Sequence, residues 1–131
     1  MTPNDTTTDD ARSQTPVTII TNSARFALGQ IVATPGALAL LQATGRSAAS
    51  LIARHMHGDW GDICKDDAAL NELALKDGSR ILSIFRLVDP EKLKATPHSK
   101  RTSLKSAWVI TDAADEHGVR HVTTILRPED Y

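Results

Sequence analysis

One nine-residue stretch decides the fold of this chain, residues 54–62, which reads RHMHGDWGD. The residues before it have apolar side chains at helical spacing, and the residues after it lead into strands. Gly58 and Gly61 flank an Asp-Trp pair, which indicates positive φ angles and a close approach of the backbone. We therefore expect this corner to join a helical layer to a sheet, with Trp60 buried at the joint.

Three helices are expected around the corner. A threonine followed by proline, beginning at Thr34, is typical of a helix start. A second helix from about Ser47 has its apolar residues at helical spacing and places His55 at the end of its buried stripe. Residues 65–77 predict a third helix, which has acidic residues in its first turn and a glycine after its last.

The remaining apolar segments predict strands, which we expect at residues 26–33, 80–88, 105–111 and 119–127. Residues 115–118 predict the turn of a hairpin between the last two strands. Residues 89–104 are polar, contain two prolines and are expected to form a long basic surface loop. Because strands and helices are grouped apart, the sequence predicts an α+β fold: two or three helices packed on one face of a mostly antiparallel sheet of about four strands.

The length of 131 residues fits one domain, which we expect to span residues 17–131. Residues 1–16 are rich in Thr, Asp, Asn and Pro and predict a disordered tail. Residues 17–20 are short and β-branched, which favours an additional edge strand. Apolar residues make up 40% of the chain and aromatics only 4%, so the core is expected to be aliphatic.

Charge and cysteine content restrict the function and the compartment. With 15 Lys and Arg against 16 Asp and Glu, the chain has no global basic field for nucleic acid, although a local patch leaves nucleic-acid binding open. The single cysteine, Cys64, excludes an intrachain disulfide and favours a reducing, cytoplasmic compartment. No apolar run of about 18 residues and no signal-peptide pattern occur, so no contact with a membrane is expected.

No metal or other cofactor is expected from the motifs. His55 and His57 are two positions apart, so on a helix their side chains point in nearly opposite directions and cannot ligate one ion. The chain lacks a second thiol and the HExxH, GxSxG, GxGxxG and P-loop patterns. The chain therefore has no recognised catalytic motif, and whether it is an enzyme stays open at this stage.

The alternative function to consider is a small metal-independent endoribonuclease, like a toxin. His55 at a helix end would then act as general acid or base, and residues of the sheet would stabilise the charged transition state. These residues would be Arg80, Arg86, Thr124 and Arg127. Equally, Arg86 and Arg127 are expected to be solvated charges beside carboxylates.

Candidate binding residues come from two places. Asp59, Trp60 and Asp62 belong to the corner, where a turn presents polar and aromatic groups together. Lys100 and Arg101 belong to the basic loop, which lacks interleaved aromatics, so base stacking is not implied there.

Several short motifs carry a resemblance to known proteins: TPGAL at residues 34–38, RHxxGDWG at 54–61, Asn71, GxRILS at 78–83, WxIT at 108–111 and TTILxPEDY at 123–131. From about Gly29 onward the chain resembles a family of small, mostly uncharacterised proteins carried by proteobacterial plasmids and other mobile elements, some labelled restriction-related. The long basic loop and residues 118–122 depart from the family pattern, so a role of the hairpin tip is not carried over.

The resemblance implies an accessory protein of a mobile element that acts by binding a host macromolecule. The implied partner is a host protein or nucleoprotein, with a component of a restriction or CRISPR defence system as the candidate.

Overall fold

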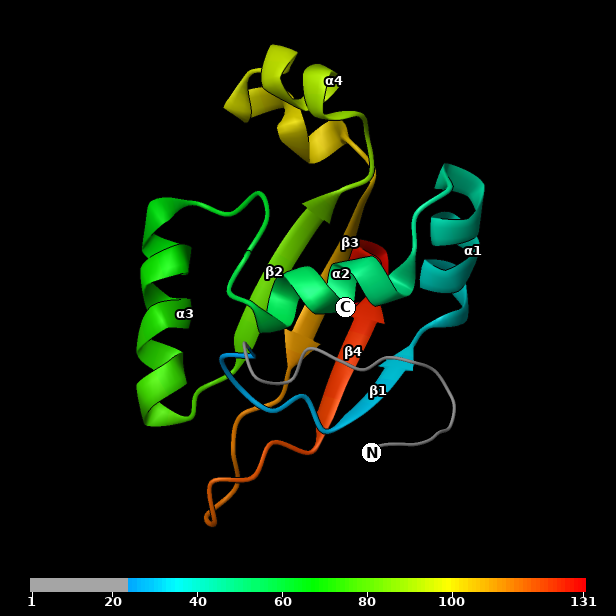
Figure 1. Ribbon diagram of the computed structural model, residues 1–131. Coiled ribbons are helices and arrows are strands. Elements are labelled where there is room, and N and C mark those ends of the chain that lie inside the picture. The colour runs from blue at the N-terminus through cyan, green and yellow to red at the C-terminus, as the bar shows by residue number, and fades with distance from the viewer. Residues whose placement is uncertain (1–23) are drawn as a thin grey trace, which may run out of the picture.

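The computed structural model describes residues 24–131, and the expectations for residues 1–16 and 17–20 lie outside this range. One four-stranded sheet has the order β1-β4-β3-β2 (Figure 1). Its strands are β1 (Gln30–Ala33), β2 (Ile81–Arg86), β3 (Ser106–Thr111) and β4 (Val122–Leu126). β2, β3 and β4 are antiparallel neighbours, whereas β1 pairs with β4 in parallel. The sheet is therefore mixed, and the predicted α+β class is confirmed.

Two helices lie over one face of the sheet, α1 (Pro35–Thr44) and α2 (Ala48–Met56), while α3 (Lys65–Asp77) runs beside β2 at the sheet edge (Figure 1). Each helix begins where the sequence offers a cap. Thr34 accepts a hydrogen bond from the Ala37 N–H, and Ser47 accepts one from the Ser50 N–H. The chain closes with a short 3-10 helix, η3 (Pro128–Asp130).

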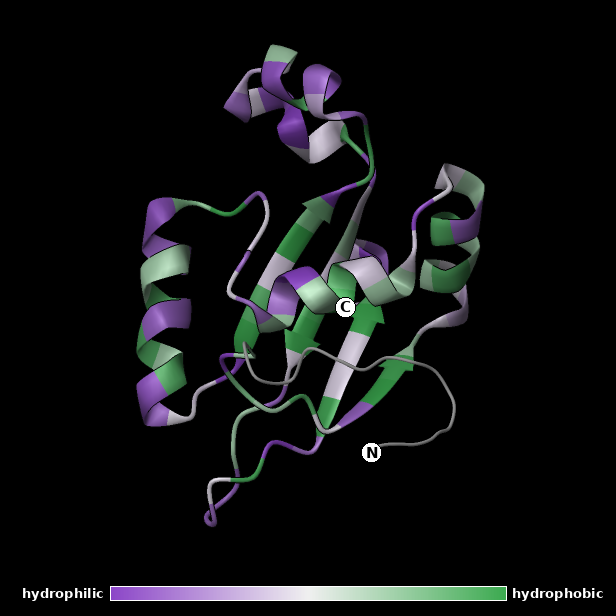
Figure 2. Cartoon of the chain, viewed as in Figure 1, coloured by the Kyte–Doolittle hydropathy of each residue, from purple (hydrophilic) through white to green (hydrophobic). Residues whose placement is uncertain are grey.

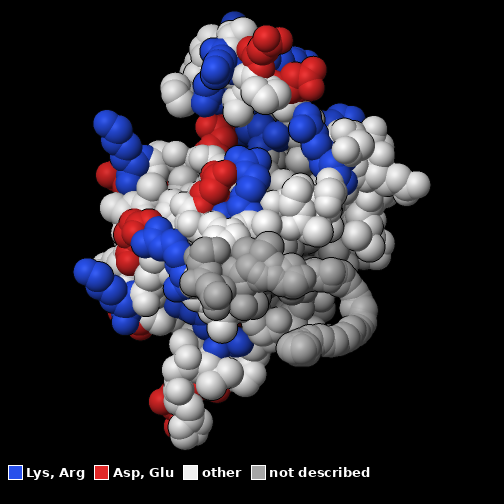
Figure 3. Space-filling view, viewed as in Figure 1, with Lys and Arg blue, Asp and Glu red and all other residues white. Residues whose placement is uncertain are grey.

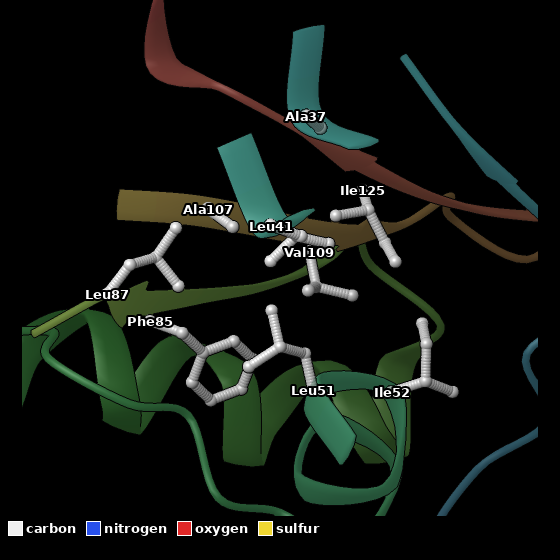
Figure 4. Packing of buried hydrophobic residues seen from close by; sticks show 9 residues of the cluster. All are labelled: Ala37, Leu41, Leu51, Ile52, Phe85, Leu87, Ala107, Val109 and Ile125. Carbon is white, nitrogen blue, oxygen red and sulfur yellow. The ribbon is translucent and has the colours of Figure 1, made fainter. Parts of the chain in front are cut away.

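The core lies between the sheet and the pair α1 and α2. Figure 2 shows that the strands carry most of the strongly apolar residues, and Figure 4 shows their side chains meeting those of the helices. Phe85 and Val109 point from the sheet toward Leu51 of α2, with Leu41 of α1 close by. The cluster contains one aromatic ring among aliphatic side chains, as the composition predicts.

The expected loop at residues 89–104 was wrong, because it contains α4 (Pro90–Ala95) and the 3-10 helix η2 (His98–Ser103). Proline at the first position of α4 favours a helix start. Neither helix has a buried residue, so the sequence has no apolar residues at helical spacing from which these helices could be predicted. Together they form an arm, residues 89–104, that extends beyond the ends of β2 and β3 (Figure 1).

The first and last strands are shorter than predicted. β1 begins at Gln30, after Gly29, whose φ is +66°. A Cβ at Gly29 would lie 2.3 Å from the His121 carbonyl oxygen, so only glycine allows this close approach. β4 begins at Val122, and the connection before it contains the expected turn, in which Asp115 accepts from the N–H groups of His117 and Val119.

Residues from outside the sheet form hydrogen bonds with the backbone of β2 along its outer edge. The Asn71 side-chain amide donates to the Leu82 carbonyl at 2.7 Å and accepts from the Leu82 N–H at 3.1 Å. Two residues along, the Ile84 N–H donates to the Trp60 carbonyl, and the Asp62 N–H donates to the Ile84 carbonyl. The backbone groups that an edge strand leaves open are thereby satisfied, and α3 is attached to the sheet.

We predict that Asn71→Ala lowers the free energy of unfolding by about 2 kcal/mol, because it leaves the Leu82 N–H and carbonyl without partners at a covered edge. Urea denaturation followed by circular dichroism measures the change. Gln42→Ala, which truncates an exposed amide on α1, is the control and should change stability by less than about 0.5 kcal/mol. Equal effects of the two substitutions would contradict the edge role of Asn71.

Candidate functional site

His55 lies near the end of α2 and is completely buried against the sheet. Its Nδ1 lies 2.6 Å from the Ser83 hydroxyl on β2, and its Nε2 lies 2.9 Å from the Thr111 hydroxyl on β3. The rings of Phe26 and Trp60 pack edge-on against the imidazole, with centroid distances of 5.1 and 6.1 Å. The side chain is thus enclosed by two hydroxyl groups and two aromatic rings.

The hydrogen bonds around His55 form a chain with one direction. The Thr123 hydroxyl donates to the Leu28 carbonyl at 2.7 Å, so its oxygen accepts from the Thr111 hydroxyl at 2.7 Å. Thr111 has then used its only hydrogen and accepts from His55 Nε2–H. Nδ1 is left as the acceptor for the Ser83 hydroxyl. This order places a hydrogen on Nε2, and in the neutral imidazole Nδ1 is then the acceptor.

Burial lowers the pKa of His55 to about 4, since no charged group lies beside the ring to compensate for the loss of water. At neutral pH the imidazole is therefore uncharged. A general acid or base must come within hydrogen-bonding reach of a substrate, and both nitrogens of His55 are already bonded inside the core. The geometry supports a structural role for His55 and gives the nuclease hypothesis no support.

The side chains of the four other residues in the nuclease hypothesis do not lie beside His55. These residues are Arg80, Arg86, Thr124 and Arg127. Thr123 and Ile125 face the helices, so Thr124 between them points to the opposite face of the sheet. By the same alternation Arg86 follows the buried Phe85 and points away from the helices. The sheet itself therefore separates these side chains from the imidazole.

Arg80 and Arg127 are engaged elsewhere. Arg80 donates to the Tyr131 hydroxyl at the C-terminus. Arg127 forms a bidentate pair with Asp130, and the same carboxylate accepts from the Thr34 hydroxyl at 2.7 Å. Hydrogen bonds from Arg127 and Thr34 hold the pKa of Asp130 far below its ordinary value. These contacts attach η3 to the start of α1.

Trp60 closes the joint between helix and sheet, as expected from the corner sequence. It is 7% exposed and packs with Ala74 of α3 and Ile81 of β2. Its indole N–H donates to Glu72 at 3.1 Å, and Glu72 also pairs with Arg25. The prediction that Trp60 is buried at the joint is confirmed.

The two aspartates of the corner have different partners. Asp59 accepts from Arg54 at 2.7 Å and from the Gly61 N–H at 3.1 Å, which stabilises the turn. Desolvation acts in the opposite direction, but these hydrogen bonds keep the pKa of Asp59 below its ordinary value.

Asp62 connects the corner to the arm. It accepts from Arg86 at 2.8 Å with one carboxylate oxygen and from Arg101 at 3.0 Å with the other. Burial opposes ionisation, yet the two guanidinium groups lower the pKa of Asp62. Lys100, next to Arg101 on η2, is exposed. On the face that Figure 3 shows, acidic and basic side chains lie next to one another over the arm.

The face of the sheet that α1 and α2 do not cover carries apolar and aromatic side chains. Ile84 of β2 and Trp108 of β3 are paired neighbours on this face. The Tyr131 ring packs on Trp108 with a centroid distance of 5.5 Å, and the Arg80 guanidinium lies 5.5 Å from the centre of the same tyrosine ring. We use the name open face for the surface formed by Leu70, Leu82, Ile84, Trp108 and Tyr131.

Leu70 belongs to this surface because of its place on α3. Asn71 points at the edge of β2, and Glu72 points toward the α2 side, where it bonds Trp60. Successive helical residues are rotated by about 100°, so Leu70 points to the opposite side, that of the open face. Its side chain is 61% exposed.

Within residues 24–131, no three His, Cys, Asp or Glu side chains come together in a way that would hold a metal ion. Over the same range, none of the helices combines the length and apolar character needed to cross a bilayer.

Comparisons with known protein families, with curated proteins and with solved structures found no match. The resemblance to mobile-element proteins therefore stays a prediction.

Sequence reasoning missed the polar groups that surround His55. Strand alternation could have placed Thr111 and Thr123 on the same face as Val109 and Ile125, but not their contact with an imidazole. It also missed Arg120, which is 8% exposed. The guanidinium of Arg120 donates to three backbone carbonyls, those of Ala74, Ser79 and Asp112. The polar sequence around Arg120 gives no signal for this buried role.

The lowered pKa of His55 predicts a loss of stability in mild acid. The unfolded chain takes up a proton below its ordinary pKa of 6.5, whereas the folded chain resists protonation down to about 4. The contribution of His55 to the free energy of unfolding should be fully present above pH 7 and should fall by about 3 kcal/mol between pH 6.5 and 4. Urea denaturation at a series of pH values measures this profile. His55→Leu should flatten it, while His98→Gln, at an exposed site, should keep it; an unchanged slope in His55→Leu would disprove the assignment.

Gly61 tests the close approach at the corner. Gly61 and Gly118 have similar φ angles, +74° and +79°, but only at Gly61 would a Cβ meet another atom, the Ile84 carbonyl oxygen at 2.0 Å. Gly118→Ala should cost roughly 1 kcal/mol from the backbone conformation alone. Gly61→Ala should cost at least about 3 kcal/mol because the paired strand must also move. Thermal or urea unfolding of both variants gives the comparison, and equal losses would refute the close contact.

Proposed function

We propose that this protein is a non-catalytic interaction module that binds a host protein through its open face. The carrying observation is that Leu82, Ile84 and Trp108, on the sheet face opposite α1 and α2, are only half-buried, with the exposed Tyr131 packed on Trp108. The resemblance to mobile-element proteins supports a partner from the host cell, such as a component of a restriction or CRISPR defence system.

The exposure of apolar groups supports a protein partner. Leu70 and Tyr131 are 61% and 68% exposed, and Leu73, next to Leu70 on α3, is 53% exposed. Single exposed leucines need no explanation, but neighbouring ones beside an uncovered sheet face are typical of interaction sites.

The residue types are also those of protein interfaces. Trp108, Tyr131 and Arg80 form one stacked group, and Trp, Tyr and Arg are the residues most often found to dominate binding energy. Each is held in place by its neighbour, so little side-chain freedom is lost when a partner binds.

The charges around the open face argue for a protein rather than a nucleic acid. Arg127 is paired with Asp130, and Arg80 donates to the Tyr131 hydroxyl. Neutralising phosphates requires cations that are free to pair with them. The balance on this face therefore favours a partner recognised by shape and apolar contact.

The proposal predicts that a charge on the open face removes specific partners. The tagged chain is used to capture proteins from a proteobacterial lysate, with quantitative mass spectrometry as the measurement. Proteins retained by the wild type should be reduced at least about tenfold with Leu70→Glu, because a buried charge disrupts an apolar contact.

The matched control is Leu38→Glu, since Leu38 is 52% exposed on α1, away from the open face. It should retain the same proteins as the wild type. The proposal fails if no protein is retained above the level of the tag alone, or if both variants retain the same set.

A further inference from the structure

A groove lies at one end of the open face, where the sheet meets α1 and η2. Its volume is about 770 Å³, which is within the range of pockets that hold small molecules. Its floor is formed by β2 and β3, one wall by the first turns of α1, and another by the end of η2. We call it the α1–η2 groove.

The floor offers a flat apolar surface. Ile84 and Trp108 are a cross-strand pair and both line the groove, and Leu40 and Leu104 line it from the two walls. An indole beside aliphatic side chains is a good surface for a planar ring.

Positively charged side chains lie next to this apolar surface, two residues further along β2. Arg86 is two residues from Ile84 on the same face, which places it roughly 7 Å further along the strand. Lys105 lines the same end of the groove, beside the residue that pairs with Arg86. The spacing is close to the length of a small ring that carries an anionic substituent.

The cations at this end are not fully neutralised. Asp62 is shared by Arg86 and Arg101, so one carboxylate faces two guanidinium groups. Lys105 makes no ion pair with any residue of the described chain. An excess of positive charge therefore remains beside the groove.

The opposite end of the groove differs. Arg127 lies so close to Gly36 that a Cβ there would be 2.3 Å from the guanidinium carbon, which fixes the arginine against α1. Its charge is matched by Asp130 and Glu129. An anion is accordingly attracted to the end at Arg86 and Lys105, and a ring to the floor between the two ends.

We propose that the α1–η2 groove binds a small aromatic anion, with the ring on Ile84 and Trp108 and the carboxylate or phosphate at Arg86 and Lys105. The inference does not depend on the proposed binding of a host protein. The apolar floor of the groove fits the ring of the ligand, and the positively charged end fits its acidic group.

The test is a titration of the full ¹⁵N-labelled chain with phenyl phosphate and with phenylacetate, followed by NMR. The Trp108 indole N–H signal should shift in a saturable way with a Kd below about 1 mM for at least one of them. The Trp60 indole N–H, which donates to Glu72 on the other side of the sheet, should not shift and serves as the internal control. A lower Kd for one probe identifies its acidic group, phosphate ester or carboxylate, as the one preferred.

Benzyl alcohol has the ring without the charge, and inorganic phosphate has the charge without the ring. Both should bind at least about tenfold more weakly than the better aromatic anion. Lys105→Gln should weaken that anion about fivefold, whereas Lys76→Gln, which removes an exposed lysine from α3, should leave its Kd unchanged. Non-saturable shifts, equal binding of benzyl alcohol, or an unchanged Kd in Lys105→Gln would each overturn the inference.

Discussion

The structure depends on a buried imidazole that must find hydrogen-bond partners away from water. Both nitrogens of His55 are satisfied, one by Ser83 of β2 and one by Thr111 of β3. A buried polar group without a partner is costly, so these bonds fix the position of α2 over two strands at once. The aromatic rings of Phe26 and Trp60 complete the enclosure and exclude water from the network.

The sheet divides the polar residues of the chain into two groups with different roles. On the helix side, the imidazole and the hydroxyl groups bond one another and hold the layers together. On the other side, Arg80, Trp108 and Tyr131 lie at the surface, where a partner has access. Because one sheet lies between the groups, His55 does not act together with Arg80 or Arg86, and the binding that we propose uses the side of the sheet away from His55.

Local patterns predicted the elements around the corner well. Capping residues placed α1 and α2, and the residues before Gly78 were correctly predicted to form α3. The predictions failed where partners are distant or side chains are not buried. Parallel pairing of β1 with β4 joins segments about ninety residues apart, which no local pattern reports. The two helices of the arm at residues 89–104 have no buried residue, so they lack the apolar periodicity from which a helix is predicted.

By itself the sequence determined the α+β class, the three larger helices and the burial of Trp60, because these follow from residue spacing and from the conformations that glycine and capping residues allow. Only the tertiary structure decided what His55 bonds, which arginines share a face and where a groove forms. Those outcomes depend on which strands pair and which side chains then meet across the core. Such contacts are set by packing between segments far apart in the chain, and the order of residues within each segment does not contain them.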